Sequence, residues 1–384
     1  MSLFRRCAFL ILLCFTALPV SAQTTSTPTT TAEKNESYEQ AIVENVELLG
    51  TTDQTGAGSQ VEVYRVKFTS GPLKNQSREI KNEVESNPYR IALEVGDRLI
   101  MLVQTNPDGT AAFYIEGYDR QTAIIWLIIA FVATMVLLSG WQGLKVAFSI
   151  GISIALIGYV LIPLFLRGVN PVPVAIILGG VLTLISTTFS TGWNKKSYVT
   201  VIGTIGGTLV AYAVSVFFAN WAHLNGLSSE EDRLFFGNNP TLSARGLLFA
   251  GIIIASVGVV EDVAVSIASG VAEIRRRSPQ TSVYQLFRSG MTIGNDHMAA
   301  LANTLVFAYV GASLSSLLLY QQFGSSWLKF VNFDTVVDEI VRSLSGTIGL
   351  AFTVPITALL AAWVMAHTKP SEQQNENHLH THHH

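Results

Sequence analysis

The chain has 384 residues, of which 49% are hydrophobic and only 13% charged, so it is too apolar for an ordinary soluble protein. Its formal net charge of −3 and its lack of a dense basic tract exclude a nucleic-acid-binding surface built on phosphate contacts. Several apolar runs reach the ~20 residues that a helix needs to cross a bilayer. We therefore expect an α-helical, multi-pass (polytopic) membrane bundle with the lipid bilayer as its main partner and no nucleic acid.

Residues 1–22 have the three regions of a secretory signal peptide. Two arginines come first, an apolar core follows, and Val20-Ser21-Ala22 offers small residues to signal peptidase. An uncleaved first membrane helix is the alternative, although the apolar core is short for a span. Both cysteines, Cys7 and Cys14, lie in this segment, so a cleaved chain has neither disulfides nor thiolate metal sites.

Two segments of different character follow before the membrane part. Residues 23–40 are rich in Thr, Ser and other polar residues, and we expect a flexible linker there. Residues 41–120 alternate short β-type runs with turn chemistry, as at 61–68 and 106–109. This pattern predicts a small extracytoplasmic β-barrel-like domain of about five strands, of the OB or SH3 type. The domain has no cluster of His, Cys or paired carboxylates, which favours a docking or gate-capping module.

Seven apolar stretches fill residues 121–367, the expected transmembrane domain. They lie at about 122–139, 146–166, 171–190, 198–219, 246–272, 298–320 and 343–366. If the β domain is outside, seven crossings place the C-terminus in the cytoplasm. Basic residues give the same orientation, because Lys145, Lys195 and residues 275–277 fall in the expected inner loops.

The stretch 251–319 carries acids where a membrane helix normally avoids them. The spacing i, i+4, i+7 and i+11 places four polar side chains on one face of the fifth expected helix. These are Asp262, Ser266, Ser269 and Glu273. Asp296 and Asn303 share a face of the sixth helix, which is antiparallel to the fifth. We expect these six side chains to line a polar path that opens to the cytoplasm.

Three further polar residues in this stretch have less defined roles. Glu261 is about 100° around the helix from Asp262 and cannot share its face, so we expect one of the two acids to pair with a different helix or to be protonated. Thr304 serves either the path or a hydrogen bond between helices. Tyr309 is a further polar position inside the sixth expected helix.

Two membrane motifs, taken as a pair, carry a resemblance to a known family. The first is Glu261-Asp-Val-Ala-Val-Ser-Ile-Ala-Ser269. The second comprises Gly294-Asn-Asp-His-Met298 and Asn303-Thr-Leu-Val-Phe-Ala-Tyr-Val-Gly-Ala-Ser-Leu314. With these motifs, and with Thr69-Ser-Gly-Pro-Leu73 upstream, the chain resembles the YibE/F family of bacterial multi-pass membrane proteins over residues 40–367. The resemblance implies this architecture in a bacterial inner or plasma membrane, and says far less about mechanism.

The polar path favours a secondary transporter or permease-like channel for a small solute or ion, and we expect neither catalysis nor a cofactor. No nucleotide-binding loop of the form Gly-x-x-x-x-Gly-Lys-Ser/Thr is present, so transport would be secondary, passive or powered by a partner. The alternative is a scaffold or signalling protein that links the β domain to cytoplasmic partners. Association with further copies, or with another membrane protein, is compatible with both functions.

An intramembrane aspartyl protease that uses Asp262 and Asp296 is a minor alternative. Paired carboxylates on adjacent helices can share a proton for acid–base work. However, the residues around the two acids lack the Tyr-Asp and Gly-x-Gly-Asp patterns that such proteases show. We therefore expect no enzymatic activity.

Residues 368–384 form an expected cytoplasmic tail that is rich in histidine. The histidines are His378, His380, His382, His383 and His384. An affinity tag, a low-complexity end and a weak metal-binding tract are all open interpretations of this tail.

Overall fold

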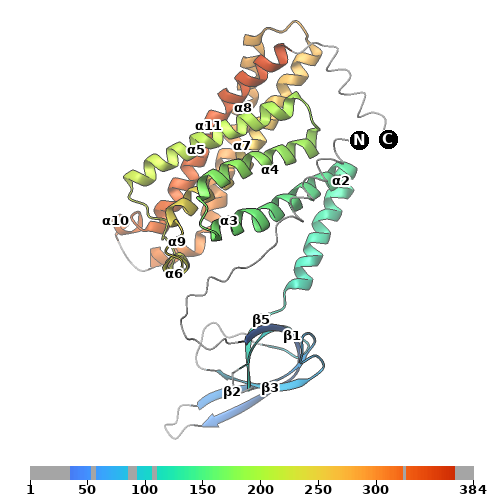
Figure 1. Cartoon of the computed structure of the whole chain (residues 1–384), viewed down its shortest axis with the longest axis vertical. Helices are drawn as coiled ribbons and strands as arrows, with labels where there is room; N and C mark the ends of the chain where they lie inside the picture. Colours follow the sequence, from blue (N-terminus) through green and yellow to red (C-terminus); the bar gives the residue numbers. More distant parts are fainter. Residues whose placement is uncertain (1–34, 53–57, 85–92, 106–109, 323–325, 368–384) are drawn as a thin grey trace. The chain divides into compact units, whose positions relative to one another are not determined.

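The computed structural model describes residues 35–52, 58–84, 93–105, 110–322 and 326–367. The predicted signal peptide and His-rich tail lie outside these residues. The chain divides into two compact units, Met1–Ile128 and Ile129–His384. Figure 1 shows a β-sheet in the first unit and a helical bundle in the second.

The first unit is built on a five-stranded antiparallel sheet with the order β3-β2-β1-β4-β5. Its strands are β1 (Asn35–Thr52), β2 (Gly58–Phe68), β3 (Ser77–Val84), β4 (Arg98–Thr105) and β5 (Ala111–Tyr118). Because β1 is long, it pairs with β4 through its first half and with β2 through its second. Alternate residues of β2 and β4, among them Tyr64, Phe68 and Met101, are buried and form the core.

The sheet is not closed, so the prediction of a barrel-like domain is wrong. Closure would require β3 to pair with β5, but these strands are the two edges of the sheet. The number of strands agrees with the prediction, and β2 covers the expected run at 61–68. β1 begins inside the segment expected to be a linker, at Asn35, and a turn at Gly96 precedes β4.

The second unit is a bundle of long helices joined by short ones. The long helices are α2 (Gln121–Leu156), whose residues up to Ile128 belong to the first unit, α4 (Pro171–Thr191), α5 (Lys195–Trp221), α7 (Ala244–Arg277), α8 (Val283–Ala312) and α11 (Asp334–Ala366). The short elements are the π-helix η1 (Ile157–Leu161), α3 (Ile162–Leu166), α6 (Glu230–Asn238), α9 (Leu314–Gln322) and α10 (Trp327–Phe330). Side-chain oxygens cap the N-termini of α4, α5, α7 and α8, where the backbone N–H groups lack helical partners.

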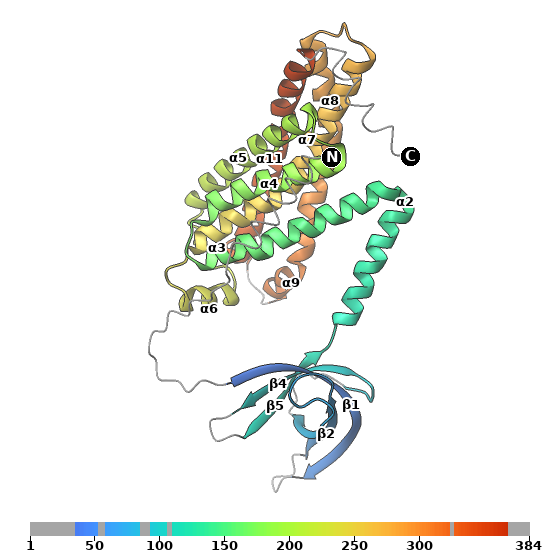
Figure 2. The same ribbon diagram turned by 45° about the vertical axis from the view of Figure 1, so that its right-hand side comes forward.

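Helix α2 bends sharply at Gly140, where the backbone has φ 55° and ψ −137°. Glycine adopts such positive φ values readily, because it has no Cβ atom. Figure 2 shows the two straight arms that meet at this bend. The expected spans 122–139 and 146–166 are therefore two arms of one helical stretch, Gln121–Leu166.

Five helical stretches in the described part of the chain are long and apolar enough to cross a membrane, where seven were expected. They are Gln121–Leu166, Pro171–Ser190, Lys195–Trp221, Ala244–Arg277 and Asp334–Ala366. The bend at Gly140 accounts for one difference in the count. The other is the expected span 298–320, which falls on α8 and α9. Helix α8 has 30 residues, but it is not among the five stretches that are apolar enough to cross a membrane.

Helix α11 packs against α5, α7 and α8, and small residues bring it close to α5. A Cβ atom on Gly349 of α11 would lie 2.7 Å from the backbone oxygen of Gly207 and 2.6 Å from the Cβ of Ala211, both on α5. Small residues at such contacts let membrane helices approach closely. The same principle acts on α8, where Gly294 faces Val354 of α11.

The substitution Gly349→Ala should destabilise the helical unit by about 1–3 kcal/mol, since the added methyl group meets backbone that no side-chain rotation can move. Thermal unfolding of the full-length protein in detergent would measure this loss. Gly151→Ala is the matched control, because no atom lies within 4 Å of its Cβ position. In a helix, alanine is more favourable than glycine by ~1 kcal/mol. An equal gain in the free energy of unfolding in both variants would therefore contradict the proposed close contact.

Candidate functional site

The predicted polar stripe of α7 lies on a side of the helix that the other described helices leave uncovered. Asp262 is exposed, and Ser266 and Ser269 are half-buried. Gly258, one turn before Asp262, is also exposed, and no atom lies within 4 Å of its Cβ position. By contrast, Ile267 on the opposite side is fully buried in the core. We call residues Asp262, Ser266 and Ser269 the α7 stripe.

Helix α8 places His297 close enough to Asp262 for an electrostatic interaction between the two side chains. Asp296 and Asn303 are exposed on the surface of α8. The contact between the helices is made by other residues, since Gly270 of α7 packs against the Ile293 side chain. His297 was not among the residues predicted to line the path, although it directly follows Asp296 in the motif.

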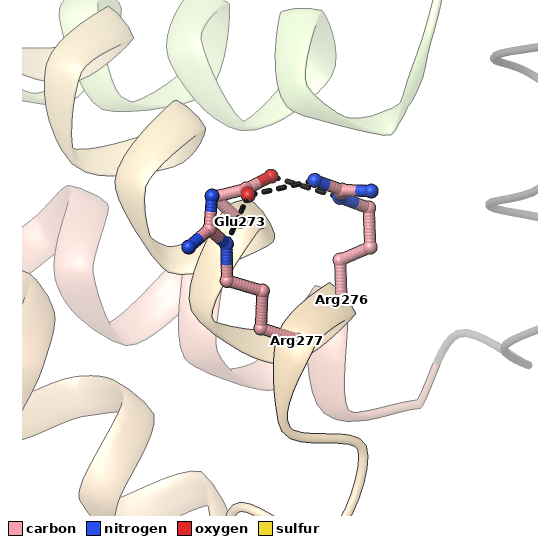
Figure 3. A network of polar contacts seen from close by, with 3 residues as sticks. All are labelled: Glu273, Arg276 and Arg277. Carbon is pink, nitrogen blue, oxygen red and sulfur yellow. Dashed lines mark hydrogen bonds and ion pairs between the residues drawn. The ribbon is translucent and has the colours of Figure 1, made fainter.

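Glu273 ends the predicted stripe in a local ion-pair network, which Figure 3 shows. Its carboxylate accepts hydrogen bonds from Arg276 at 2.7 and 2.9 Å and from Arg277 at 2.6 Å. The side chains are largely exposed, so these pairs contribute little to stability. Two guanidinium groups therefore compensate the charge of Glu273 locally.

The third arginine of this run, Arg275, reaches the last helix instead. Its guanidinium group donates to the backbone oxygens of Thr281 at 2.9 Å and of Ala366 at 3.0 Å. Ala366 is the last residue of α11, where carbonyl groups lack partners inside the helix. Arg275 therefore caps α11 in addition to marking the expected cytoplasmic side.

Glu261 faces a different helix from its neighbour Asp262. Only 9% of its surface is exposed, and its carboxyl group lies beside the hydroxyl groups of Ser186 and Thr183 on α4. The 100° rotation between consecutive helix residues explains this divergence. Two adjacent acids on α7 thus have opposite surroundings, one inside the bundle and one on its open side.

Threonine hydroxyls surround the region where α4, α5 and α7 meet. Thr204 and Thr208 of α5, together with Gly179 of α4 and Val257 of α7, line a cavity of about 10 Å³. Thr183, Thr204 and Thr208 are almost fully buried, and their hydroxyls have no hydrogen-bond partner of normal geometry within the described ranges. The sequence did not reveal this region, because a threonine in a membrane helix usually bonds to its own backbone.

The two remaining predicted residues lie away from the α7 stripe. Thr304 is exposed and donates to the backbone oxygen of Ala300 in its own helix at 3.2 Å. Tyr309 is half-buried, with the Arg342 guanidinium of α11 at 6.0 Å from its ring centre.

A second charged cluster lies at the start of α11. Arg342 pairs with Glu339 at 3.6 Å, and the buried Asp338 lies beside Ser228. These acids were not among the predicted site residues. Among the residues that the structure describes, no group of three or more His, Cys, Asp or Glu side chains could hold a metal ion.

The membrane part of the chain matches a known family. The sequence profile of the family described as YibE/F-like protein matches residues 127–367, which contain the whole candidate site. Comparison with curated proteins and with solved structures gives no match.

If Asp262 and His297 interact, their substitutions should not have additive effects. We expect Asp262→Asn to change the unfolding free energy less in a His297→Asn background than in the wild type, by about 0.2–1 kcal/mol for a partly exposed pair. Thermal unfolding of the four proteins in detergent near pH 6 would measure the coupling. Strict additivity would mean that the two side chains do not interact.

Proposed function

The chain belongs to the YibE/F-like protein family, and we propose that it is a secondary transporter or permease-like channel for a small solute or ion. The observation that carries the proposal is the exposed Asp262 on the uncovered side of α7. A carboxylate that faces lipid at membrane depth costs at least ~2.5–3.5 kcal/mol, so such groups normally face protein or water. An uncovered acid is therefore expected where water, a solute or a partner chain replaces the lipid.

The proposed path runs along α7 and α8. Asp262 is its solute- or ion-contacting group, with His297 as electrostatic partner, and the two serines of the α7 stripe continue it toward the α7–α8 loop. Asp296 and Asn303, both exposed, supply polar groups on α8. We leave Glu273 out of the path, because arginines hold both of its oxygens. No step of this mechanism makes or breaks a covalent bond, so we propose transport without catalysis.

We further propose seven membrane crossings in the bacterial cell membrane, with the N-terminal unit outside and the C-terminus inside. The 46 residues of Gln121–Leu166 would extend about 69 Å at ~1.5 Å per residue, more than twice the ~30 Å hydrocarbon core. Each arm beside Gly140 is therefore long enough for one crossing, and α8 is long enough for another. The basic residues of the expected inner loops support this orientation.

Replacing Asp262 with Asn should reduce solute flux through the purified protein in liposomes by at least about tenfold, since it removes the charge with little change in shape. The assay would screen inorganic ions and small organic acids. Glu231→Gln is the control, because Glu231 is an exposed acid on α6, outside the proposed path. Equal flux of every solute through wild type and Asp262→Asn would contradict transport by this path. If Asp262→Asn changed only the amount of protein in the membrane and not the flux, the scaffold function would be favoured.

The orientation can be tested with single cysteines in a background that lacks Cys7 and Cys14. Thr241→Cys, before α7, should react with a membrane-impermeant maleimide on intact cells. Gln280→Cys, in the α7–α8 loop, should react only after the cells are permeabilised. Both positions are exposed, so burial would not limit the reaction. The reverse labelling pattern would show that the orientation is wrong.

A further inference from the structure

The contact of Glu261 with α4 has the properties of an ion site that is separate from the α7 stripe. We propose that Glu261, Thr183 and Ser186 bind a small monovalent cation, with Na⁺ as the expected ion. We call these three residues the α4–α7 site. The site lies between two helices on the inside of the bundle, and binding there does not depend on the transport function proposed above.

The donor atoms of the α4–α7 site are all oxygens. The Glu261 carboxylate provides two oxygen atoms, and the hydroxyl groups of Thr183 and Ser186 lie beside it. Hard cations such as Na⁺ take oxygen ligands. Thr183 is 0% exposed, and its hydroxyl oxygen has no hydrogen-bond partner of normal geometry within the described residues. A bound cation would use the lone pairs of this oxygen, which are unfavourable to leave unused in the protein interior.

The charge of the site favours a monovalent ion. Within the described part of the chain, the charged side chain that interacts with Glu261 is Asp262, and it is also acidic. An ionised Glu261 therefore lacks a protein counter-charge, which is costly for a buried group. One monovalent cation neutralises it, whereas a divalent ion would leave an excess positive charge in a medium of low dielectric constant.

The space beside the site favours a small ion. Val257 and Gly179 line the cavity of about 10 Å³, and they lie one helical turn before Glu261 and Thr183 on their respective helices. A cavity of this size holds about one water-sized particle. The unpartnered hydroxyls of Thr204 and Thr208 face this region, so a water molecule there has polar partners next to the ion. The cavity lies one helical turn away from the three site residues, and its small volume shows that α4, α5 and α7 pack closely here, so we expect the smaller Na⁺ to be preferred over K⁺.

Thermal unfolding of the purified full-length protein in detergent would test the proposal. At pH 8 and constant ionic strength, replacing choline chloride with NaCl should raise the melting temperature with a saturable dependence, because the ion binds only the folded state. KCl should give a smaller rise at equal concentration. A rise that is equal for Na⁺ and choline would overturn the proposal. So would stability that changes with pH but not with Na⁺, as expected if Glu261 is simply protonated.

Variants assign the effect to these residues. Glu261→Gln should abolish the Na⁺ dependence, and Thr183→Val should raise the half-saturating Na⁺ concentration about tenfold, as expected for the loss of one ordinary interaction. Glu231→Gln, which removes an exposed acid on α6, is the matched control and should keep the full Na⁺ response. Asp262→Asn removes a neighbouring negative charge, so it should lower the affinity for Na⁺ without abolishing the saturable response, even if it abolishes flux. If Glu261→Gln does not fold, Thr183→Val and Ser186→Ala decide the matter. An unchanged Na⁺ response in both would overturn the proposed site.

Discussion

The close approach of α5 and α11 is the constraint on which the helical unit depends. Thr353 and Thr357 of α11 face Gly207 and Gly203 of α5, where any side chain would collide with them. Lipid is as apolar as the helix surfaces, so tight van der Waals packing rather than the hydrophobic effect favours such a contact. The Thr353 hydroxyl donates to the oxygen of Gly349 in its own helix at 2.8 Å, so it is satisfied without separating the helices. Since α7 packs on both α5 and α11, this pair also decides which side of α7 is left open.

The two adjacent acids of α7 show how one helix can serve two environments. Consecutive residues point about 100° apart, so a helix that packs on one side can present one carboxyl group to a neighbouring helix and the next to the open side. Glu261 and Asp262 do this at the same depth in the bundle. Their charges are close enough to affect each other, and an event at one residue is therefore felt at the other. Such proximity offers a physical basis for communication between the two sides of the bundle.

Sequence reasoning succeeded where structure follows from local spacing. The three residues of the α7 stripe lie on one face because residues spaced i, i+4 and i+7 point in similar directions from a helix. All three belong to the first of the two family motifs. The contact of Glu261 with Thr183 was not predictable, because it depends on which helix packs where. The prediction of a closed sheet was wrong for the same reason. Closure depends on pairing between β3 and β5, which are not neighbours in the sequence. The gap between the expected spans 122–139 and 146–166 contains a bend at Gly140 within one helical stretch rather than a loop between two helices.

The hydrogen bond from Arg275 to Ala366 has a mechanical consequence. It links the C-terminal end of α7 to the last turn of α11, so the two helix ends are expected to move together while the hydrogen bond is formed. Helix α11 ends at that point. A displacement of the last turn of α11 would therefore also act on α7, the helix that carries both membrane acids. The C-terminal end of α11 is thus mechanically coupled to α7 inside the bundle.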